Sequence, residues 1–198
     1  MFPDLPWEIH PDLTRERLVA IGHLITRGRN DAVMWQNPEI GDDGWVLGCR
    51  AFQAARYQII SAAGTEGFEW LEIVDPSKHL IFSVGGVPVR FYRGLAEEPT
   101  TRTLRQTFPE LEQLALVFPG DERQDLAFRF AVETDVDGTV AVMRFVGLLG
   151  ESAVLNWPVP LEGATVSIFP VAPPAEGVEL PAPSVQIPGA DADEAQTG

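Results

Sequence analysis

A short arginine-rich run is the part of the sequence best suited to binding chemistry. Arg90, Tyr92 and Arg93 lie almost side by side, and Arg102 and Arg105 follow shortly after. Planar guanidinium groups form paired, charge-assisted hydrogen bonds with carboxylates and phosphates, and a tyrosine hydroxyl can add another bond. We therefore expect these side chains, called the arginine/tyrosine group below, to be the candidate binding residues.

Several partners fit the arginine/tyrosine group. The arginines could bind a nucleotide or a phosphorylated metabolite, or they could bind another protein. They could instead form ion pairs within the chain, with Glu69, Glu97 or Glu98 or with the acidic C-terminal residues. Exposed ion pairs contribute only about 0–1 kcal/mol each, so this last alternative predicts a small effect when the arginines are removed.

No other motif indicates catalysis or a bound cofactor. The run 133–138 resembles the opening of a calcium loop, but Arg144 stands where that loop needs its last acidic ligand, so we expect a hairpin turn. His10, His23 and His79 are too scattered for a metal site and are expected to be structural. Phosphate-loop, dinucleotide-binding and serine-nucleophile motifs are absent from the sequence. The sequence thus implies no cofactor and no metal, and it favours a non-enzymatic protein while leaving catalysis open.

Cys49 is the only cysteine, which excludes a disulfide within the chain and fits a reducing compartment. It lies on a predicted helix between Trp45 and Phe52, at a spacing that puts the three side chains on one face. A nucleophilic cysteine needs an accessible, electropositive setting and a nearby base. We expect instead that Cys49 is a small, buried core residue.

Two helices are expected in the N-terminal part of the chain. The first begins at the N-cap Thr14, and the second begins after Asp42 or Asp43 and ends before Gly64. Their predicted buried faces comprise Leu18, Ile21 and Ile25, and Trp45, Cys49, Phe52, Ile59 and Ala63. Four arginines of the first helix are expected to face water, namely Arg15, Arg17, Arg27 and Arg29.

A third helix is expected to begin at residues 107–110. Thr107 and Glu110 are spaced as in a capping box, in which each side chain accepts a hydrogen bond from the backbone N–H of the other residue. The predicted buried face of this helix comprises Leu111, Leu114, Ala115 and Phe118.

Two β-hairpins are the clearest strand signals. Gly85-Gly86 suits a two-residue turn that needs positive φ, and a second turn is expected near Asp137-Gly138. The first register puts Arg90 and Tyr92 on the face opposite Phe91. The expected pairs of the first hairpin are Val84–Val87, Phe82–Val89 and Leu80–Phe91. In the second hairpin, the expected apolar face pairs Phe128, Phe130 and Val132 with Met143 and Phe145. The expected polar face of that hairpin carries Arg129, Glu133 and Arg144. Further strands are expected at 68–74, 154–159 and 165–169.

Composition limits the class of protein. The 198 residues carry a formal net charge of −15, which repels phosphate backbones, so direct nucleic-acid binding is not expected. There is no apolar run of roughly 18 residues for a membrane span and no signal-peptide pattern, so we expect a cytoplasmic protein that does not bind membranes. We expect an N-terminal arm at 1–13, one domain at 14–171 and an acidic, proline-rich, disordered tail at 172–198.

Four sequence features occur together. The first is an arginine-bearing first helix that ends near Arg29-Asn30, and the second is Gly41-Asp42 followed by Trp45 and Gly48-Cys49-Arg50. The third is the run 87–94. The fourth is the run 131–135, which precedes a hairpin turn and, later, a proline-rich tail. Together they span the chain from about residue 13, and the chain resembles a group of uncharacterised bacterial proteins. The genes of that group tend to neighbour a helix-turn-helix regulator fused to an ImmA/IrrE-type metallopeptidase. The resemblance implies an accessory role in a stress, prophage or toxin–antitoxin-like module and implies no activity and no site residues.

The sequence predicts an α+β fold in which two or three helices pack on a mostly antiparallel sheet built from hairpins. Our leading hypothesis is a non-enzymatic interaction or regulatory protein that binds another protein, such as the product of an adjacent gene. The alternative is a small-ligand binder or enzyme that uses the arginine/tyrosine group, and a concave pocket at that group would favour it. An acidic mimic of nucleic acid is least favoured, because much of the excess negative charge lies in the predicted tail.

Overall fold

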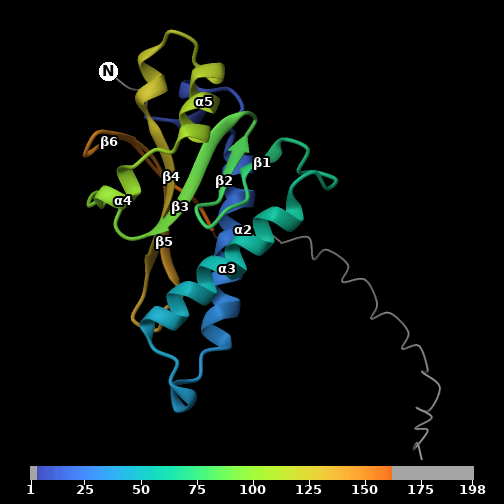
Figure 1. The fold of residues 1–198 in the computed structure, drawn as a ribbon, viewed down its shortest axis with the longest axis vertical. Helices are drawn as coiled ribbons and strands as arrows, with labels where there is room; N and C mark the ends of the chain where they lie inside the picture. The colour runs from blue at the N-terminus through green and yellow to red at the C-terminus, as the bar shows by residue number, and fades with distance from the viewer. Residues whose placement is uncertain (1–3, 162–198) are drawn as a thin grey trace, which may run out of the picture. The chain divides into compact units, whose positions relative to one another are not determined.

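Six strands of the chain form one sheet, and helices cover it (Figure 1). The computed structural model describes residues 4–161. The helices are α1 (Pro6–Ile9), α2 (Arg15–Met34), α3 (Gly44–Ala62), α4 (Thr101–Leu104) and α5 (Phe108–Val117), with short 3-10 helices η1 (Pro38–Ile40) and η2 (Glu122–Asp125). The strands are β1 (Leu71–Asp75), β2 (Ile81–Val84), β3 (Val87–Arg93), β4 (Ala127–Thr134), β5 (Val140–Leu149) and β6 (Ser152–Pro158).

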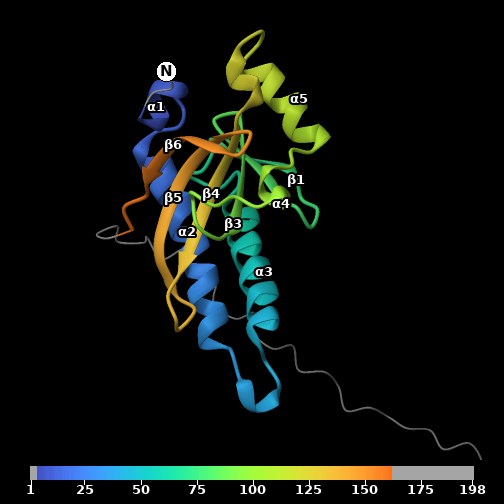
Figure 2. The ribbon, with the colours of Figure 1, turned by 90° about the vertical axis from the view of Figure 1, so that its left-hand side faces the viewer.

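The strands follow one another in the sheet in chain order, from β1 to β6 (Figure 2). Every neighbouring pair is antiparallel except β3 and β4, which run parallel. The segment from α4 to η2 makes the crossover that a parallel pair requires. The predicted α+β class with a mostly antiparallel sheet is therefore confirmed, and the parallel pair is the feature that the sequence did not indicate.

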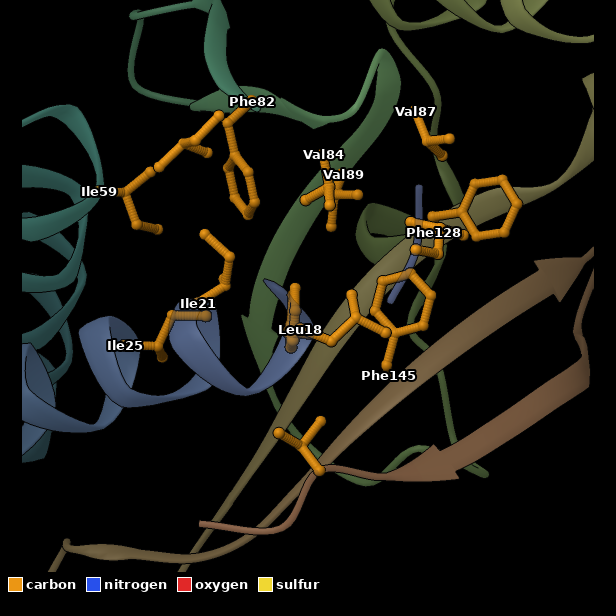
Figure 3. Packing of buried hydrophobic residues seen from close by; sticks show 14 of the residues in the cluster. Leu18, Ile21, Ile25, Ile59, Phe82, Val84, Val87, Val89, Phe128 and Phe145 are labelled. Atoms are coloured by element: carbon orange, nitrogen blue, oxygen red, sulfur yellow. The ribbon is translucent and has the colours of Figure 1, made fainter. Parts of the chain in front are cut away.

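The main core lies between one face of the sheet and the two long helices (Figure 3). Leu18, Ile21 and Ile25 of α2 are buried there, together with Ile59 of α3. The sheet contributes the buried side chains Phe82, Val84, Val89, Phe128, Phe130 and Phe145. Burial of such a side chain stabilises the fold by about 1.5–3 kcal/mol, so this layer sets where α2 and α3 lie.

The predicted helix ends agree well with the structure. The Thr14 hydroxyl accepts a hydrogen bond from the backbone N–H of Arg17, and the Asp43 carboxylate accepts from those of Trp45 and Val46. Gly64, just after α3, has a φ of 73°, as a helix-terminating glycine does.

The predicted buried face of α3 is confirmed at Ile59, with Phe52 and Ala63 partly buried against the core, and it is wrong at Trp45 and Cys49. Trp45 is 75% exposed and Cys49 is also exposed. The buried side chains of this helix are Leu47, Ala51, Ala55, Ile59 and Ala62. The reason is close helix packing: a Cβ added to Gly28 of α2 would lie 2.4 Å from the backbone nitrogen of Ala55. Only the face of α3 made of small residues permits that approach to α2.

The two hairpins form as predicted, with one exception. Phe82 pairs with Val89 and Val84 with Val87, while Phe130 faces Phe145 and Val132 faces Met143. The expected pair of Leu80 with Phe91 does not form, because Leu80 has a φ of 31° and precedes β2. The expected strands at 68–74 and 154–159 correspond to β1 and β6. The run 133–138 leads through a turn from β4 to β5, as expected.

The other face of the sheet is not bare. Ala127, Ala131, Val146 and Leu148 are buried there in a second, smaller cluster with Ala96. Leu104 of α4 and Tyr92 pack against this cluster. Helix α4 therefore lies on the face opposite α2 and α3.

The predicted capping box of α5 does not form. The Thr107 side chain makes no capping hydrogen bond, and the Glu110 side chain is fully buried in contact with Arg129. The buried face of this helix is also shifted. Glu110, Leu114 and Phe118 are buried, whereas Leu111 and Ala115 are exposed.

The part of the predicted N-terminal arm that the structure describes packs on the domain. Residues 6–9 form α1, and both Ile9 and Leu13 are buried in the main core. Trp7 makes an edge-to-face contact with Trp157 of β6. The expected strand at 165–169 and the expected tail at 172–198 lie outside the described residues.

Candidate anion-binding cavity

An open edge of the sheet creates the candidate site. The residues of β3 that pair with β2 are Val87, Pro88 and Val89, so residues 90–93 extend beyond β2, and no other strand within residues 4–161 pairs with them on that side. A cavity of about 590 Å³ lies at this edge, between α3, the loop before β2 and the α4 segment. Its volume is within the range of about 300–1,000 Å³ that is typical of small-molecule sites.

The lining of this cavity is strongly basic. It includes the cations Arg29, Lys78, Arg90, Arg93, Arg102 and Arg129, together with His79. No aspartate or glutamate of residues 4–161 belongs to the lining. The chain carries only 14 Lys and Arg against 29 Asp and Glu, so six cations without a carboxylate are a pronounced local reversal of the net charge.

Two of these arginines are neighbours in the sheet. The parallel register of β3 and β4 puts Arg90 directly opposite Arg129, and the two side chains lie on the same face. Both contact the Glu110 carboxylate, which comes from the first turn of α5. Arg90 and Arg129 thus share the single buried carboxylate of Glu110. One of the two positive charges therefore has no counter-charge within this cluster.

Arg129 is almost completely buried and is only partly satisfied. Its Nε donates to the carbonyl of Thr103 at 3.1 Å, and its Nη1 donates to the Phe128 carbonyl at 2.9 Å and to Glu110 Oε1. Its Nη2 has no hydrogen-bond acceptor within residues 4–161. A buried donor without an acceptor costs about 1–3 kcal/mol, and more when the group is charged, so Arg129 favours an additional anion.

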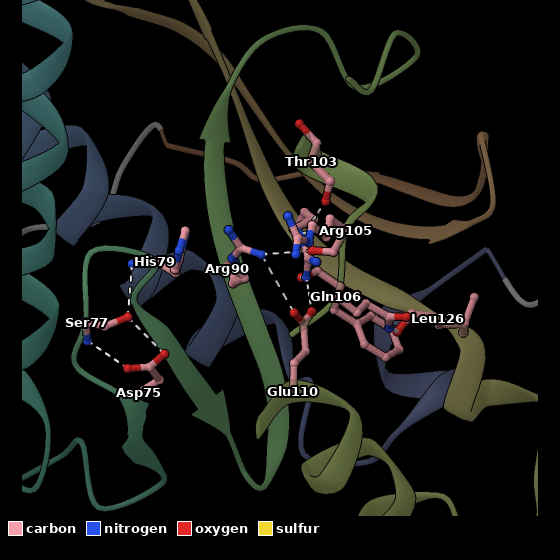
Figure 4. A network of polar contacts seen from close by, with 11 residues as sticks. Asp75, Ser77, His79, Arg90, Thr103, Arg105, Gln106, Glu110 and Leu126 are labelled. Carbon is pink, nitrogen blue, oxygen red and sulfur yellow. Dashed lines mark hydrogen bonds and ion pairs between the residues drawn. The ribbon is translucent and has the colours of Figure 1, made fainter. Parts of the chain in front are cut away.

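Arg90 lines the cavity and also contacts Glu110 of the buried cluster (Figure 4). Its Nη1 donates to the Arg105 carbonyl at 3.1 Å and lies 3.8 Å from Glu110 Oε2. Burial lowers the pKa of Arg90, and the positive charge of Arg129 lowers it further, while Glu110 acts in the opposite direction. An anion bound in the cavity would offset the repulsion between the positive charges of Arg90 and Arg129.

A second pair of arginines lies on the other side of β3. Arg29 of α2 is 5% exposed, and its Nε donates to the Gly138 carbonyl in the β4–β5 turn at 2.6 Å. Burial lowers the pKa of Arg29, and the charge of the nearby Arg93 adds to the effect. The expectation that Arg29 faces water is wrong, because the β4–β5 hairpin covers it.

Tyr92 contributes a hydroxyl with a defined direction. The hydroxyl donates to the Leu95 carbonyl at 3.0 Å. Burial, with a smaller contribution from Glu133, raises the pKa of Tyr92 to about 12. The phenol therefore stays protonated near neutral pH and adds no negative charge to the basic lining.

Helix α3 forms the opposite wall with aromatic and very small side chains. Phe52 stacks on Phe91 of β3, with ring centroids 5.1 Å apart. Trp45, Gly48 and Cys49 also line the cavity. Cys49 was expected to be a core residue, and the structure instead exposes its thiol at the cavity because α3 turns its other face to α2.

The structure brings most of the arginine/tyrosine group together. Arg90, Tyr92, Arg93 and Arg102 all line the cavity. Arg105 does not line it and contributes its carbonyl to Arg90 instead. The expected ion pairs of the group with Glu69, Glu97 or Glu98 are not among those formed within residues 4–161, which involve other acidic side chains.

The sequence did not single out Arg29, Arg129 or Lys78 as binding residues. One signal for Arg129 was present, since its neighbours on the same strand face are Ala127 and Ala131. A strand face with small apolar residues on both sides of an arginine is typical of a covered face. For Arg29 and Lys78 we find no comparable signal.

Neither a metal-binding cluster nor a membrane-spanning helix is present within residues 4–161. Residues 4–161 contain no group of three or more His, Cys, Asp and Glu side chains placed to hold a metal ion. None of their helices combines the length and the apolar character needed to span a membrane. Comparison of the chain with known protein families, curated proteins and solved structures found no match.

Proposed function

We propose that the chain binds a small anionic molecule, such as a nucleotide or a phosphorylated metabolite, in the cavity beside β3. The observation that carries the proposal is a concave site that, within residues 4–161, has six lining cations, no lining carboxylate and a buried guanidinium nitrogen without an acceptor. Phosphate and carboxylate oxygens match guanidinium groups in charge and in geometry. This function was the alternative hypothesis from the sequence, and the concave shape now favours it over a flat interaction surface.

The negative net charge of the chain strengthens the argument that this basic cavity binds an anion. A protein with a net charge of −15 gains no general attraction for anions. Concentrating six of 14 basic side chains around one cavity destabilises the fold through like-charge repulsion, unless ligand binding offsets it. Stacked Phe52 and Phe91 offer an apolar surface for the uncharged part of a ligand.

The test is a thermal-shift and calorimetric titration of the full chain with inorganic phosphate, nucleotides and phosphorylated sugars. Cys49 provides a second readout, because it is the single thiol of the chain and lies in the lining. A bound ligand should slow its alkylation. Absence of binding by every phosphorylated compound tested would contradict the proposal.

Matched variants connect binding to the cavity. Arg93→Gln and Arg102→Gln remove exposed lining cations that form no ion pair within residues 4–161. Arg15→Gln and Arg27→Gln make the same change on exposed positions of α2 away from the lining. Binding should weaken only in the first pair. Equal weakening in both pairs would indicate a nonspecific effect of net charge.

A second candidate function is the interaction with another protein that the sequence first suggested. At the tip of the α2–α3 hairpin, four large apolar side chains are mostly exposed, namely Met34, Trp35, Ile40 and Trp45. Exposed aromatic and aliphatic groups of this size are enriched at protein interfaces. The tip would then carry the accessory role that the resemblance implies, and the two functions are compatible because a ligand could regulate a partner.

Copurification from the native host tests this second candidate. A Trp35→Ser/Ile40→Ser variant should lose a partner that the unaltered chain retains, and Tyr57→Ser on the exposed side of α3 serves as the control. Retention of the partner by the tip variant would exclude this surface as the docking site.

A further inference from the structure

We infer that the ligand of the cavity carries two separated anionic groups, one bound on each side of β3. This inference rests on the proposed anion-binding function and adds the number and the spacing of the anions. It therefore specifies the class of ligand as an elongated, two-ended molecule, such as a bisphosphate.

The two sides follow from the alternation of side chains along β3. Arg90 is opposite Arg129 in the sheet and shares its face, which α4 covers. Phe91 is opposite Phe130, a residue of the main core, so Phe91 and Arg93 lie on the face of α2 and α3. Because β2 does not cover this part of β3, residues of both faces line one and the same cavity.

The first anion subsite lies on the α4 face. Arg90 and Arg129 are neighbours in the sheet, Arg102 comes from α4, which covers this face, and all three line the cavity. Glu110 is the one carboxylate that forms an ion pair with any of the three within residues 4–161. Three guanidiniums and one carboxylate carry an excess of positive charge that a doubly charged group such as a phosphate would neutralise. Within residues 4–161 the buried Nη2 of Arg129 has no acceptor, and Glu110 Oε2 in the same cluster has no donor.

The second anion subsite lies on the helix face. Arg29 is held by its bond to the Gly138 carbonyl, and Arg93 is close enough for its charge to lower the pKa of Arg29. Neither arginine forms an ion pair with a carboxylate of residues 4–161. A fixed, buried arginine beside an exposed one, with no compensating charge, is suited to a second anion.

Two glycines leave space at the cavity wall that α3 forms. Gly44 and Gly48 lie one helical turn apart on the cavity side of α3, and a Cβ added at either would meet no atom within 4 Å. Packing within residues 4–161 therefore does not require glycine at these positions, although glycine inside the helix, as at Gly48, costs about 0.5–1 kcal/mol relative to alanine. The missing side chains leave space along α3 for the body of a ligand.

The strand sets the spacing between the two anionic groups. At a rise of about 3.3 Å per residue, the Cα atoms of Arg90 and Arg93 lie roughly 10 Å apart. Because the side chains of Arg90 and Arg93 also leave opposite faces of β3, we expect two anions bound by them to lie farther apart than the adjacent phosphates of pyrophosphate. The ligand must place a spacer between its charged ends.

The experiment is a calorimetric titration of the full chain with a length series of alkanediol bisphosphates, compared with inorganic phosphate and pyrophosphate. The expected result is a maximum of affinity at an intermediate spacer length, roughly tenfold or more above pyrophosphate, because the second end binds at millimolar effective concentration. Pyrophosphate equal to or better than every longer compound would overturn the inference and leave the proposed anion binding intact. No binding by any of these compounds would overturn both.

Two single variants test which subsite binds each anionic end of the ligand. Arg102→Gln removes a cation of the first subsite and Arg93→Gln removes one of the second, and both side chains are exposed, so the fold is retained. Each should reduce the affinity of the best bisphosphate severalfold or more and leave that of monophosphate much less affected. Loss of affinity that is equal for monophosphate and bisphosphate in both variants would contradict two separate subsites.

Discussion

Arg129 and Glu110 form an ion pair that solvent does not reach: the side chains are 1% and 0% exposed. The pair connects β4 to α5 across the face of the sheet that α4 covers. It also brings Arg90 into the same cluster, because the second oxygen of Glu110 lies 3.8 Å from Arg90. One carboxylate thereby holds together the deepest part of the candidate site.

Removal of that carboxylate should destabilise the fold strongly. We expect Glu110→Ala to lower the free energy of unfolding by about 3–5 kcal/mol, the usual effect of leaving a buried charge unpaired. Glu133→Ala is the control, since Glu133 forms a partly exposed pair with Arg144 that is worth about 0–1 kcal/mol. Urea denaturation measures both. A Glu110 effect no larger than that of Glu133 would refute our account of the cluster.

Two helix glycines should respond to alanine in opposite ways. Gly48→Ala should raise stability by about 0.5–1 kcal/mol, because the added methyl meets open space and helix propensity improves. Gly28→Ala should destabilise by about 1–3 kcal/mol or more, since its Cβ would lie 2.4 Å from the Ala55 backbone nitrogen. Gly48→Leu should keep the stability and abolish ligand binding by filling the cavity. Thermal unfolding and titration distinguish these outcomes.

Cys49 should behave as a surface residue in the folded protein. We expect a thiol reagent to modify it fully under native conditions, and Cys49→Ser to change the free energy of unfolding by no more than about 0.5 kcal/mol. Reaction only after addition of denaturant would instead indicate the buried position that the sequence suggested.

Tyr92 should titrate at unusually high pH. Its pKa of about 12 in the folded state exceeds the ordinary value of about 10, so the neutral phenol favours the fold. Its contribution to stability is complete below pH about 10 and is lost as the pH rises through about 12. The difference in phenolate absorbance between the unaltered chain and Tyr92→Phe isolates this titration. A midpoint near the ordinary value would show that Tyr92 is solvated.

Local features of the chain followed from the sequence because they depend on neighbouring residues. The N-caps Thr14 and Asp43, the terminator Gly64 and the turn at Gly85-Gly86 act through hydrogen bonds and φ angles within a few residues. The alternation of the hairpins then placed Phe82 opposite Val89. The sequence alone therefore determined the α+β class, and it located four of the cavity residues, Arg90, Tyr92, Arg93 and Arg102.

The tertiary structure decided which of two apolar faces a helix buries and which strands become neighbours. Helix α3 carries one face with Trp45, Cys49 and Phe52 and another with small alanines, and periodicity cannot choose between them. The close approach of Gly28 makes the choice, which turns Cys49 to the cavity.

The parallel pairing of β3 with β4 depends likewise on contacts between residues far apart in the chain. Only this pairing puts Arg129 beside Arg90, and only the packing of α5 carries Glu110 to both. A capping box would turn the Glu110 side chain away from Arg129 and Arg90 and leave two guanidiniums without a carboxylate in the low dielectric of the protein interior. The free-energy cost of that arrangement exceeds the modest stabilisation that a capping box provides. Such a balance between distant charges is a property of the folded chain, and no local pattern in the sequence records it.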